Sequence, residues 1–191
     1  LKKYSKISKL VTNKQKSLAV RFPKHFLFRK LLKNLNYPLA APSANISSRL
    51  SSVQASDVKE EFGSKIKYIL NGGRCKIGIE STIVNLLNNL AILRLGVLDV
   101  KKIEKVLKKN ISIKIRSKKK ISPGQFSLHY SPGIPLRLNA KKIKDNEAYL
   151  LIKKIKKNKP NYYFLTKKGS LKEAAKNLYS TLRKIKNSKY K

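Results

Sequence analysis

The chain has 191 residues, of which 41% are hydrophobic and 29% charged, and its 46 Lys and Arg against 9 Asp and Glu give a net charge of +37. This length has room for one domain, or for one domain and part of another, and the apolar share excludes a disordered polybasic tail. No apolar run reaches the ~18 residues that a membrane-spanning helix needs. The single cysteine, Cys75, excludes an internal disulfide framework and a cysteine-based zinc cluster.

Hydrophobic spacing in the first hundred residues predicts strands that alternate with short helices. Leu18, Val20 and Phe22 alternate as in a strand, and residues 28–35 place apolar side chains on one helical face. In chain order, the patterns predict a strand at 16–22, a helix after Pro23 with its stripe at 28–35, a strand at 38–41, a helix capped by Asp57 and stopped by Gly63, and strands at 79–87 and 90–95 that pair as a hairpin.

The second half continues this pattern after an interruption. Residues 121–136 contain three prolines and two glycines without a helical period, which indicates a linker. Around it, the spacing predicts a helix capped by Asp99, a strand at 111–115, strands at 149–152 and 162–165, and a helix that begins with a Ser170–Glu173 capping box and carries an apolar stripe on Leu171, Ala174, Leu178, Leu182 and Ile185.

The ends of the sequence indicate a piece of a longer protein. Residue 1 is Leu and the chain contains no Met, so we expect the sequence to begin, and also to end, inside a longer chain. No secretory signal opens it, and with one cysteine a reducing cytoplasm is the expected location. The positive charge attracts polyanions such as RNA, nucleotides and pyrophosphate, although the Lys, Asn and Ile content that AT-rich coding produces explains the charge equally well.

Four segments have residue types suited to binding an anion or a small polar ligand. Short hydroxyls and backbone N–H groups can surround an anion, a guanidinium can hold a phosphate, and polar groups inside an apolar strand need partners. The serine-rich segment could instead be a surface turn, and Arg94 could equally be a charge on an edge strand. The segments are the serine-rich 42–52; 78–84, with Glu80, Ser81 and Thr82; Arg94; and 122–132, with His129 and Tyr130 between prolines.

Together with a motif at 20–23, these segments resemble, in order and spacing, the threonylcarbamoyl-AMP synthases of the Sua5/YciO/YrdC family, in the long form that carries a C-terminal Sua5 domain. The resemblance covers nearly the whole chain, and its strength lies in five weak motifs in the right order. They are Val20-Arg21-Phe22-Pro23, Ser43-Ala44-Asn45-Ile46-Ser47, Gly78-Ile79-Glu80-Ser81-Thr82-Ile83-Val84, Arg94-Leu95-Gly96, and Ser122-Pro123-Gly124 with His129-Tyr130-Ser131-Pro132.

The chain departs from the family pattern at three places. Ser48 stands where a glycine is usual, which stiffens the loop, and Ser52-Val53 stands where Pro-Thr is usual. The family also has an upstream Lys-x-Arg motif that would hold ATP phosphates, and this sequence starts downstream of it. We therefore expect the fragment alone to have little or no synthase activity.

The resemblance implies a nucleotidyltransferase that makes L-threonylcarbamoyl-AMP and pyrophosphate from L-threonine, bicarbonate or CO2, and ATP, with Mg²⁺ held by the nucleotide. The product serves the t6A modification of tRNA, so the tRNA and the t6A-transfer machinery are implied partners. No covalent catalytic residue and no protein metal site are implied. The residues implied for L-threonine are Arg21, Ala41 and Ser81; those for ATP are Ser17, Ser43, Ser51, Arg94 and Tyr130; and Asn45, Thr82 and His129 are expected neighbours of the site.

The implied fold is α/β, with a YrdC-like twisted mixed sheet and flanking helices at residues 1–116, a linker at 117–146 and part of a Sua5-type α/β domain at 147–191. Three alternatives remain open. The chain could be a basic module that binds RNA, including double-stranded RNA, without synthase activity. It could be a carbamoyl-transfer domain of the hydrogenase-maturation type, which shares the YrdC-like fold, or a decayed copy without activity.

Overall fold

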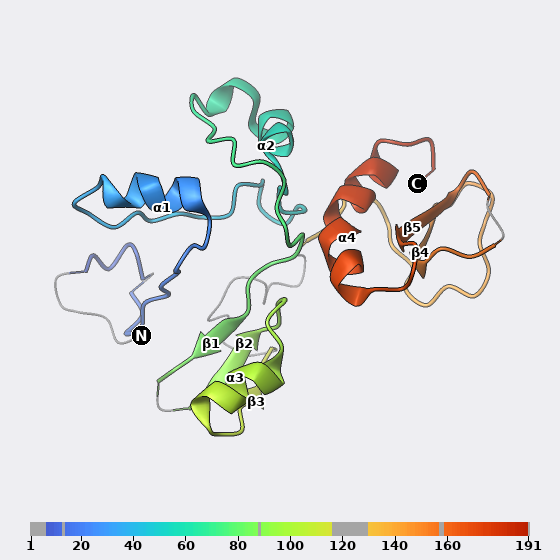
Figure 1. Ribbon diagram of the computed structural model, residues 1–191. Coiled ribbons are helices and arrows are strands. Elements are labelled where there is room, and N and C mark those ends of the chain that lie inside the picture. The colour runs from blue at the N-terminus through green and yellow to red at the C-terminus, as the bar shows by residue number, and fades with distance from the viewer. Residues whose placement is uncertain (1–6, 13, 88, 116–129, 157–158, 191) are drawn as a thin grey trace.

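The structure is a computed structural model that describes residues 7–12, 14–87, 89–115, 130–156 and 159–190 (Figure 1). In this part of the chain, helices and short strands form two units. The elements are α1 (Phe26–Lys33), α2 (Ala55–Phe62), a 3₁₀ turn η1 (Gly63–Lys65), β1 (Ile83–Asn85), β2 (Ala91–Arg94), α3 (Val100–Leu107), β3 (Ser112–Ile113), β4 (Tyr149–Lys153), β5 (Tyr162–Thr166) and α4 (Leu171–Lys186).

The first unit is built on a mixed sheet in the order β1-β2-β3. Strands β1 and β2 pair antiparallel, as the predicted hairpin requires, and β3 lies parallel to β2. Helix α3 covers this sheet, and Ile92, Ile103 and Ile111 form the buried cluster between them. Asp99 caps α3 as predicted, because its side chain accepts a hydrogen bond of 2.9 Å from the backbone N–H of Lys101. Helix α3 and β3 therefore belong to this unit.

The second unit contains two parallel strands, β4 and β5, and the long helix α4 packed on β5. The predicted cap is present at the start of α4, where the Ser170 hydroxyl accepts a hydrogen bond of 3.3 Å from the backbone N–H of Glu173. Ala174, Tyr179, Leu182 and Ile185 are the buried side chains of α4. The predicted stripe was wrong at Leu171, which is exposed, and it missed Tyr179.

Helix α4 also packs against the first unit, and in Figure 1 it lies on the side of β4 and β5 that faces that unit. Tyr179 and Leu182 form one buried cluster with Leu50 and Val53, which lie just before α2. The α4 backbone comes so close to Gly78 that a Cβ at this position would overlap the carbonyl group of Lys176. One face of α4 thus completes its own unit while another supports the segments with the serine-rich and Gly-Ile-Glu-Ser-Thr motifs.

Several predicted features of the first unit are wrong. Of the strands predicted at 16–22 and 38–41, only Ser17 forms an isolated β-bridge. Of the strand predicted at 79–87, only Ile83–Asn85 is a strand. Helix α1 ends at Lys33, two residues before the end of the predicted stripe. Asp57 lies inside α2 rather than at its cap, where its carboxylate accepts a hydrogen bond of 2.8 Å from the backbone N–H of Val53.

None of the helices in the described ranges combines the length and apolar character needed to cross a bilayer. The described fold is built on two small sheets, and helix α4 packs both on β5 and against the first unit. The serine-rich segment, the segment before β1 and Tyr130 of the predicted linker all contact α4.

We expect Ile92→Ala to lower the free energy of unfolding by about 2–5 kcal/mol, because Ile92 is fully buried and its truncation leaves a cavity between β2 and α3. The matched control is Ile113→Ala. Ile113 is the register partner of Ile92 on β3 but is 53% exposed, so we expect a loss of about 1 kcal/mol at most. Urea denaturation of both variants tests this, and equal losses would contradict the described core.

Candidate functional site

The guanidinium of Arg94, at the end of β2, is the centre of a cluster of polar side chains. Its Nε donates a hydrogen bond of 2.9 Å to the carbonyl oxygen of Ser81, and Nη2 donates one of 3.1 Å to the Ser81 hydroxyl. Nη1 donates one of 3.2 Å to the hydroxyl of Tyr130. The carboxylate of Glu80 lies 3.8 Å from Nη2. Three segments that are distant in sequence therefore meet at one planar cation.

Glu80 connects this cation to the serine-rich loop, because the Ser51 hydroxyl donates a hydrogen bond to its second carboxylate oxygen. The turn after β2 lies directly against residues 80–82, where a Cβ on Gly96 would overlap their backbone. Thr82 faces this turn and donates a hydrogen bond of 3.2 Å to the carbonyl oxygen of Leu98. The cluster is thus closed by backbone packing on one side and by the serine-rich loop on the other.

The serine-rich loop is held in shape by its own side chains. The Ser52 hydroxyl donates a hydrogen bond of 2.7 Å to the carbonyl oxygen of Ala44. The amide nitrogen of Asn45 donates to the carbonyl oxygens of Ile46 and Arg49, at 2.9 and 3.2 Å. The Oδ1 atom of Asn45 is buried and accepts no hydrogen bond from the described residues.

Tyr130 and Ser131, within the predicted linker, reach back to this loop. The backbone N–H of Ser131 donates a hydrogen bond of 2.9 Å to the carbonyl oxygen of Ser48, and Ser131 forms an isolated parallel bridge with Arg49. The Tyr130 ring stacks on Tyr179 of α4, with ring centres 5.8 Å apart and an angle of 23° between the planes. Tyr130 is therefore held between Arg94 and α4.

Burial keeps both stacked phenols in their neutral form. It raises the pKa of Tyr130, an effect that Arg94 opposes and Glu80 reinforces. Burial, with smaller contributions from Glu80 and Tyr130, also raises the pKa of Tyr179, more strongly. With neutral phenols, the charged groups of the cluster are the Arg94 cation and the Glu80 anion.

The other residues predicted for the site lie outside this cluster. Arg21, Ala41 and Ser43 are exposed in segments without regular structure, and Ser17 is half-buried. No described hydrogen bond involves the side chains of Ser17, Arg21 or Ser43. Their polar groups are thus accessible to a ligand, but no side-chain contact joins them to Arg94. The predicted neighbour His129 lies outside the described residues.

Sequence reasoning missed three residues that contact the site or its loop: Glu80 as the link between Ser51 and Arg94, Tyr179 under Tyr130, and Arg183 on α4. The signal for Glu80 was present, because an acidic residue within an apolar stretch of sequence needs a partner. Tyr179 and Arg183 are one helical turn apart on α4, but nothing in the sequence indicates what that face of the helix contacts.

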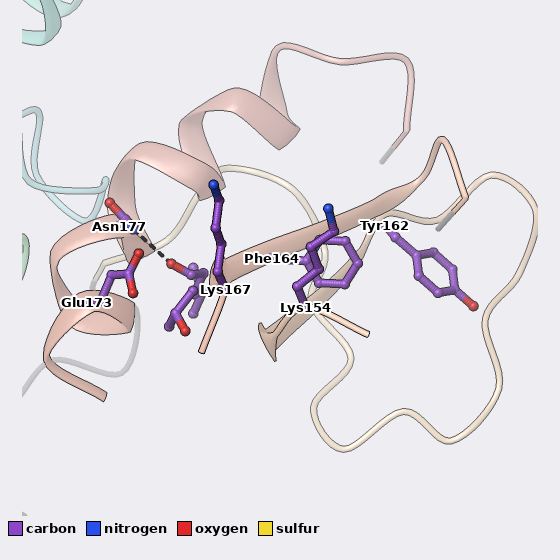
Figure 2. A pocket seen from close by; sticks show the side chains of 8 residues that line it. Lys154, Tyr162, Phe164, Lys167, Glu173 and Asn177 are labelled. Atoms are coloured by element: carbon purple, nitrogen blue, oxygen red, sulfur yellow. Dashed lines mark hydrogen bonds between the residues drawn. The ribbon is translucent and has the colours of Figure 1, made fainter. Parts of the chain in front are cut away.

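A separate pocket of about 380 Å³ lies in the second unit, between β5 and the first turns of α4 (Figure 2). Lys154 and Lys167 line it, and Asn177 donates a hydrogen bond of 2.8 Å to the carbonyl oxygen of Leu165 at its wall. None of the residues around Arg94 belongs to this pocket. Across the ranges that the structure describes, no three His, Cys, Asp or Glu side chains are grouped so that they could hold a metal ion.

Comparison with known protein families gives two matches that together cover nearly the whole chain. Residues 1–96 match the family model of the Sua5, YciO and YrdC proteins, which has the description "Telomere recombination". Residues 98–191 match the model described as "Threonylcarbamoyl-AMP synthase, C-terminal domain". The family prediction made from the motifs is confirmed by these matches.

Individual relatives are matched over only part of their own length. A threonylcarbamoyl-AMP synthase of Pyrococcus abyssi is 40% identical over 108 residues, which are 56% of this chain and 32% of the relative. A threonylcarbamoyl-AMP synthase of Bacillus subtilis is 33% identical over 136 residues, which are 69% of this chain and 39% of the relative. The chain thus spans a third to two fifths of the length of these curated relatives.

A solved structure supports the fold. The crystal structure of P. abyssi Sua5 complexed with L-threonine has 30% sequence identity and a TM-score of 0.84, and the match covers 98% of this chain and 61% of that chain. The predicted fold class, a YrdC-like α/β unit followed by a Sua5-type unit, is confirmed by this similarity.

We expect Ser48→Gly to raise the free energy of unfolding by about 0.5–1 kcal/mol. Ser48 has a φ of +69°, a left-handed conformation that costs a residue with a Cβ about 1–2 kcal/mol. About 0.4–1 kcal/mol of this gain is offset, because glycine makes the unfolded chain more flexible. Ser47→Gly is the control, since Ser47 has no positive φ and should lose stability. Denaturant titration measures both, and destabilisation by Ser48→Gly would contradict the loop geometry.

Proposed function

The chain belongs to the Sua5/YciO/YrdC family, and we propose that it is part of an L-threonylcarbamoyladenylate synthase. The proposed reaction converts L-threonine, bicarbonate or CO2, and ATP to threonylcarbamoyl-AMP and pyrophosphate, for t6A modification of tRNA in the cytoplasm. The observation that carries the proposal is the bonded cluster of Ser51, Glu80, Ser81, Arg94 and Tyr130, because it joins residues that the family resemblance assigns to both substrates.

We assign the substrates residue by residue. L-Threonine is proposed to contact Arg21, Ala41 and Ser81, and the P. abyssi Sua5 structure is a complex of that protein with L-threonine. ATP is proposed to contact Ser17, Ser43, Ser51, Arg94 and Tyr130, with Asn45, Thr82 and His129 as neighbours. The direct hydrogen bonds between Ser81 and Arg94 support adjacent threonine and nucleotide positions.

Adjacent substrates are what the proposed chemistry needs. A carboxylate oxygen of N-carboxylated threonine attacks the α-phosphorus of ATP, the bond to the β-phosphate oxygen breaks, and pyrophosphate leaves. This in-line transfer needs no covalent protein nucleophile, so the protein contributes orientation and charge stabilisation. Five N–H groups are available on the Arg94 guanidinium, and three make the hydrogen bonds to Ser81 and Tyr130. The other two can donate to phosphate oxygens.

We propose that Mg²⁺ enters the site bound to the ATP phosphates rather than to a metal site of the protein. It prefers oxygen ligands and keeps several waters, so ATP phosphates and water supply most of its coordination. Among the described residues, no three carboxylate side chains lie close enough together to coordinate the ion. The tRNA and the t6A-transfer machinery are proposed as users of the product.

The proposal predicts that the full-length protein releases pyrophosphate only when L-threonine, bicarbonate and ATP are all present. Threonylcarbamoyl-AMP should appear in the same reaction and is identified by mass spectrometry. The reaction without L-threonine is the control for simple ATP hydrolysis. Absence of the product, together with tight binding of RNA, would favour the alternative of a basic RNA-binding module.

In the full-length protein, we expect Arg21→Ala to weaken L-threonine binding and Arg94→Ala to weaken ATP binding, each ten- to hundred-fold. Loss of a charge-assisted hydrogen bond costs about 1.5–3 kcal/mol. Separate titrations of the two ligands measure this. Arg137→Ala is the control, because Arg137 is exposed and pairs with Glu147 in the second unit. Equal effects of both variants on both ligands would contradict the assignment.

A further inference from the structure

An arginine of the second unit is bonded to the main chain of the serine-rich loop. Nη2 of Arg183, on α4, donates a hydrogen bond of 2.7 Å to the carbonyl oxygen of Leu50 and one of 2.9 Å to the carboxylate of Glu61 on α2. Its Nε lies 3.9 Å from the carboxylate of Asp57, also on α2. One guanidinium therefore connects α4, α2 and the loop.

These contacts are buried, so the loss of any one of them would weaken the structure more than the loss of an exposed contact. The side chains of Glu61 and Asp57 are only 3% and 8% exposed, and a buried carboxylate needs a cation nearby. The other arginine near Glu61 is Arg49, which lies 3.8 Å away and is half-exposed. Arg183 is thus the better-buried cation beside Glu61, and it also lies within 4 Å of Asp57, whose carboxylate accepts hydrogen bonds from Val53 and Gln54.

The bond to Leu50 leads directly to the candidate site. Leu50 is buried, and the next residue, Ser51, donates its hydroxyl to Glu80. Glu80 lies beside Arg94. A displacement of the Leu50 carbonyl group would therefore move the Ser51 hydroxyl away from Glu80 and release the carboxylate that lies beside the Arg94 guanidinium.

We propose that Arg183 is a positioning residue for the nucleotide: from outside the catalytic unit, it fixes the serine-rich loop through the Leu50 carbonyl group and so sets the position of Ser51. This inference rests on the proposed function, in which Ser51 and Arg94 contact ATP. It gives the second unit a specific role in the affinity for the nucleotide.

Packing alone does not explain the arginine. The apolar cluster of Leu50, Val53, Tyr179 and Leu182 already buries side chains between α4 and the loop. A hydrogen bond adds direction, since it fixes where a carbonyl oxygen lies, whereas apolar contact is non-directional. The guanidinium also has the donors to serve a carbonyl group and a carboxylate at once.

In the full-length protein, we expect Arg183→Met to raise the Kd for ATP about tenfold, because the Leu50 carbonyl loses its donor. The Kd for L-threonine should change less than threefold, since no residue assigned to it except Ser81 touches this path. Arg183→Lys should restore most of the affinity, because both strong bonds come from one nitrogen atom. Arg137→Met, which breaks an exposed ion pair in the same unit, should leave both Kd values unchanged.

A double variant separates positioning from stability. Arg183→Met removes the buried cation beside two buried carboxylates and lowers the melting temperature, whereas adding Glu61→Gln removes the charge that most needs the arginine. Arg183→Met/Glu61→Gln should therefore fold and still bind ATP about tenfold more weakly. Isothermal titration with ATP measures this independently of turnover.

The outcomes are distinct. If the wild-type protein binds neither ATP nor L-threonine, the proposed function fails. If the wild type binds ATP and the folded double variant has the same Kd for ATP, the positioning role of Arg183 is overturned while the proposed function stands. Equal weakening of ATP and L-threonine binding would also overturn it, because that result indicates a general loss of structure.

Discussion

The contact between α4 and the serine-rich loop is the constraint on which the candidate site depends. Leu50 and Val53 lie under Tyr179 and Leu182, and this burial brings the second unit onto the first. Gly78 allows the α4 backbone to lie directly against the segment before β1. Because one rigid helix touches both segments, it sets their separation, and side chains on them can meet at hydrogen-bonding distance.

The distribution of charge follows the same constraint. The chain has only 9 acidic residues against 46 basic ones, yet Asp57, Glu61 and Glu80 all lie at this contact or in the cluster next to it, each within 4 Å of an arginine. Buried carboxylates require such partners. The acidic residues thus hold Arg94 and Arg183 in fixed positions among the many cations of the chain.

The sequence predicted much of the local structure. Ser170 and Asp99 cap their helices as expected, because a cap needs only residues that are two or three positions apart. The hairpin of β1 and β2 was equally predictable from alternating residues on either side of a short turn. The strand expected at 16–22 failed for the opposite reason, since a strand also needs a neighbour that its own sequence does not specify.

By itself, the sequence determined which chemical groups are present and in what order, because the motifs around Ser51, Ser81, Arg94 and Tyr130 can be read from residue types and spacing alone. Only the tertiary structure decided that these groups meet, and that Arg183 reaches the same loop. Contacts between residues 36 to 133 positions apart depend on how α4 packs against the first unit. That packing is set by the summed burial of many side chains and by directional bonds to backbone atoms, which no local pattern encodes.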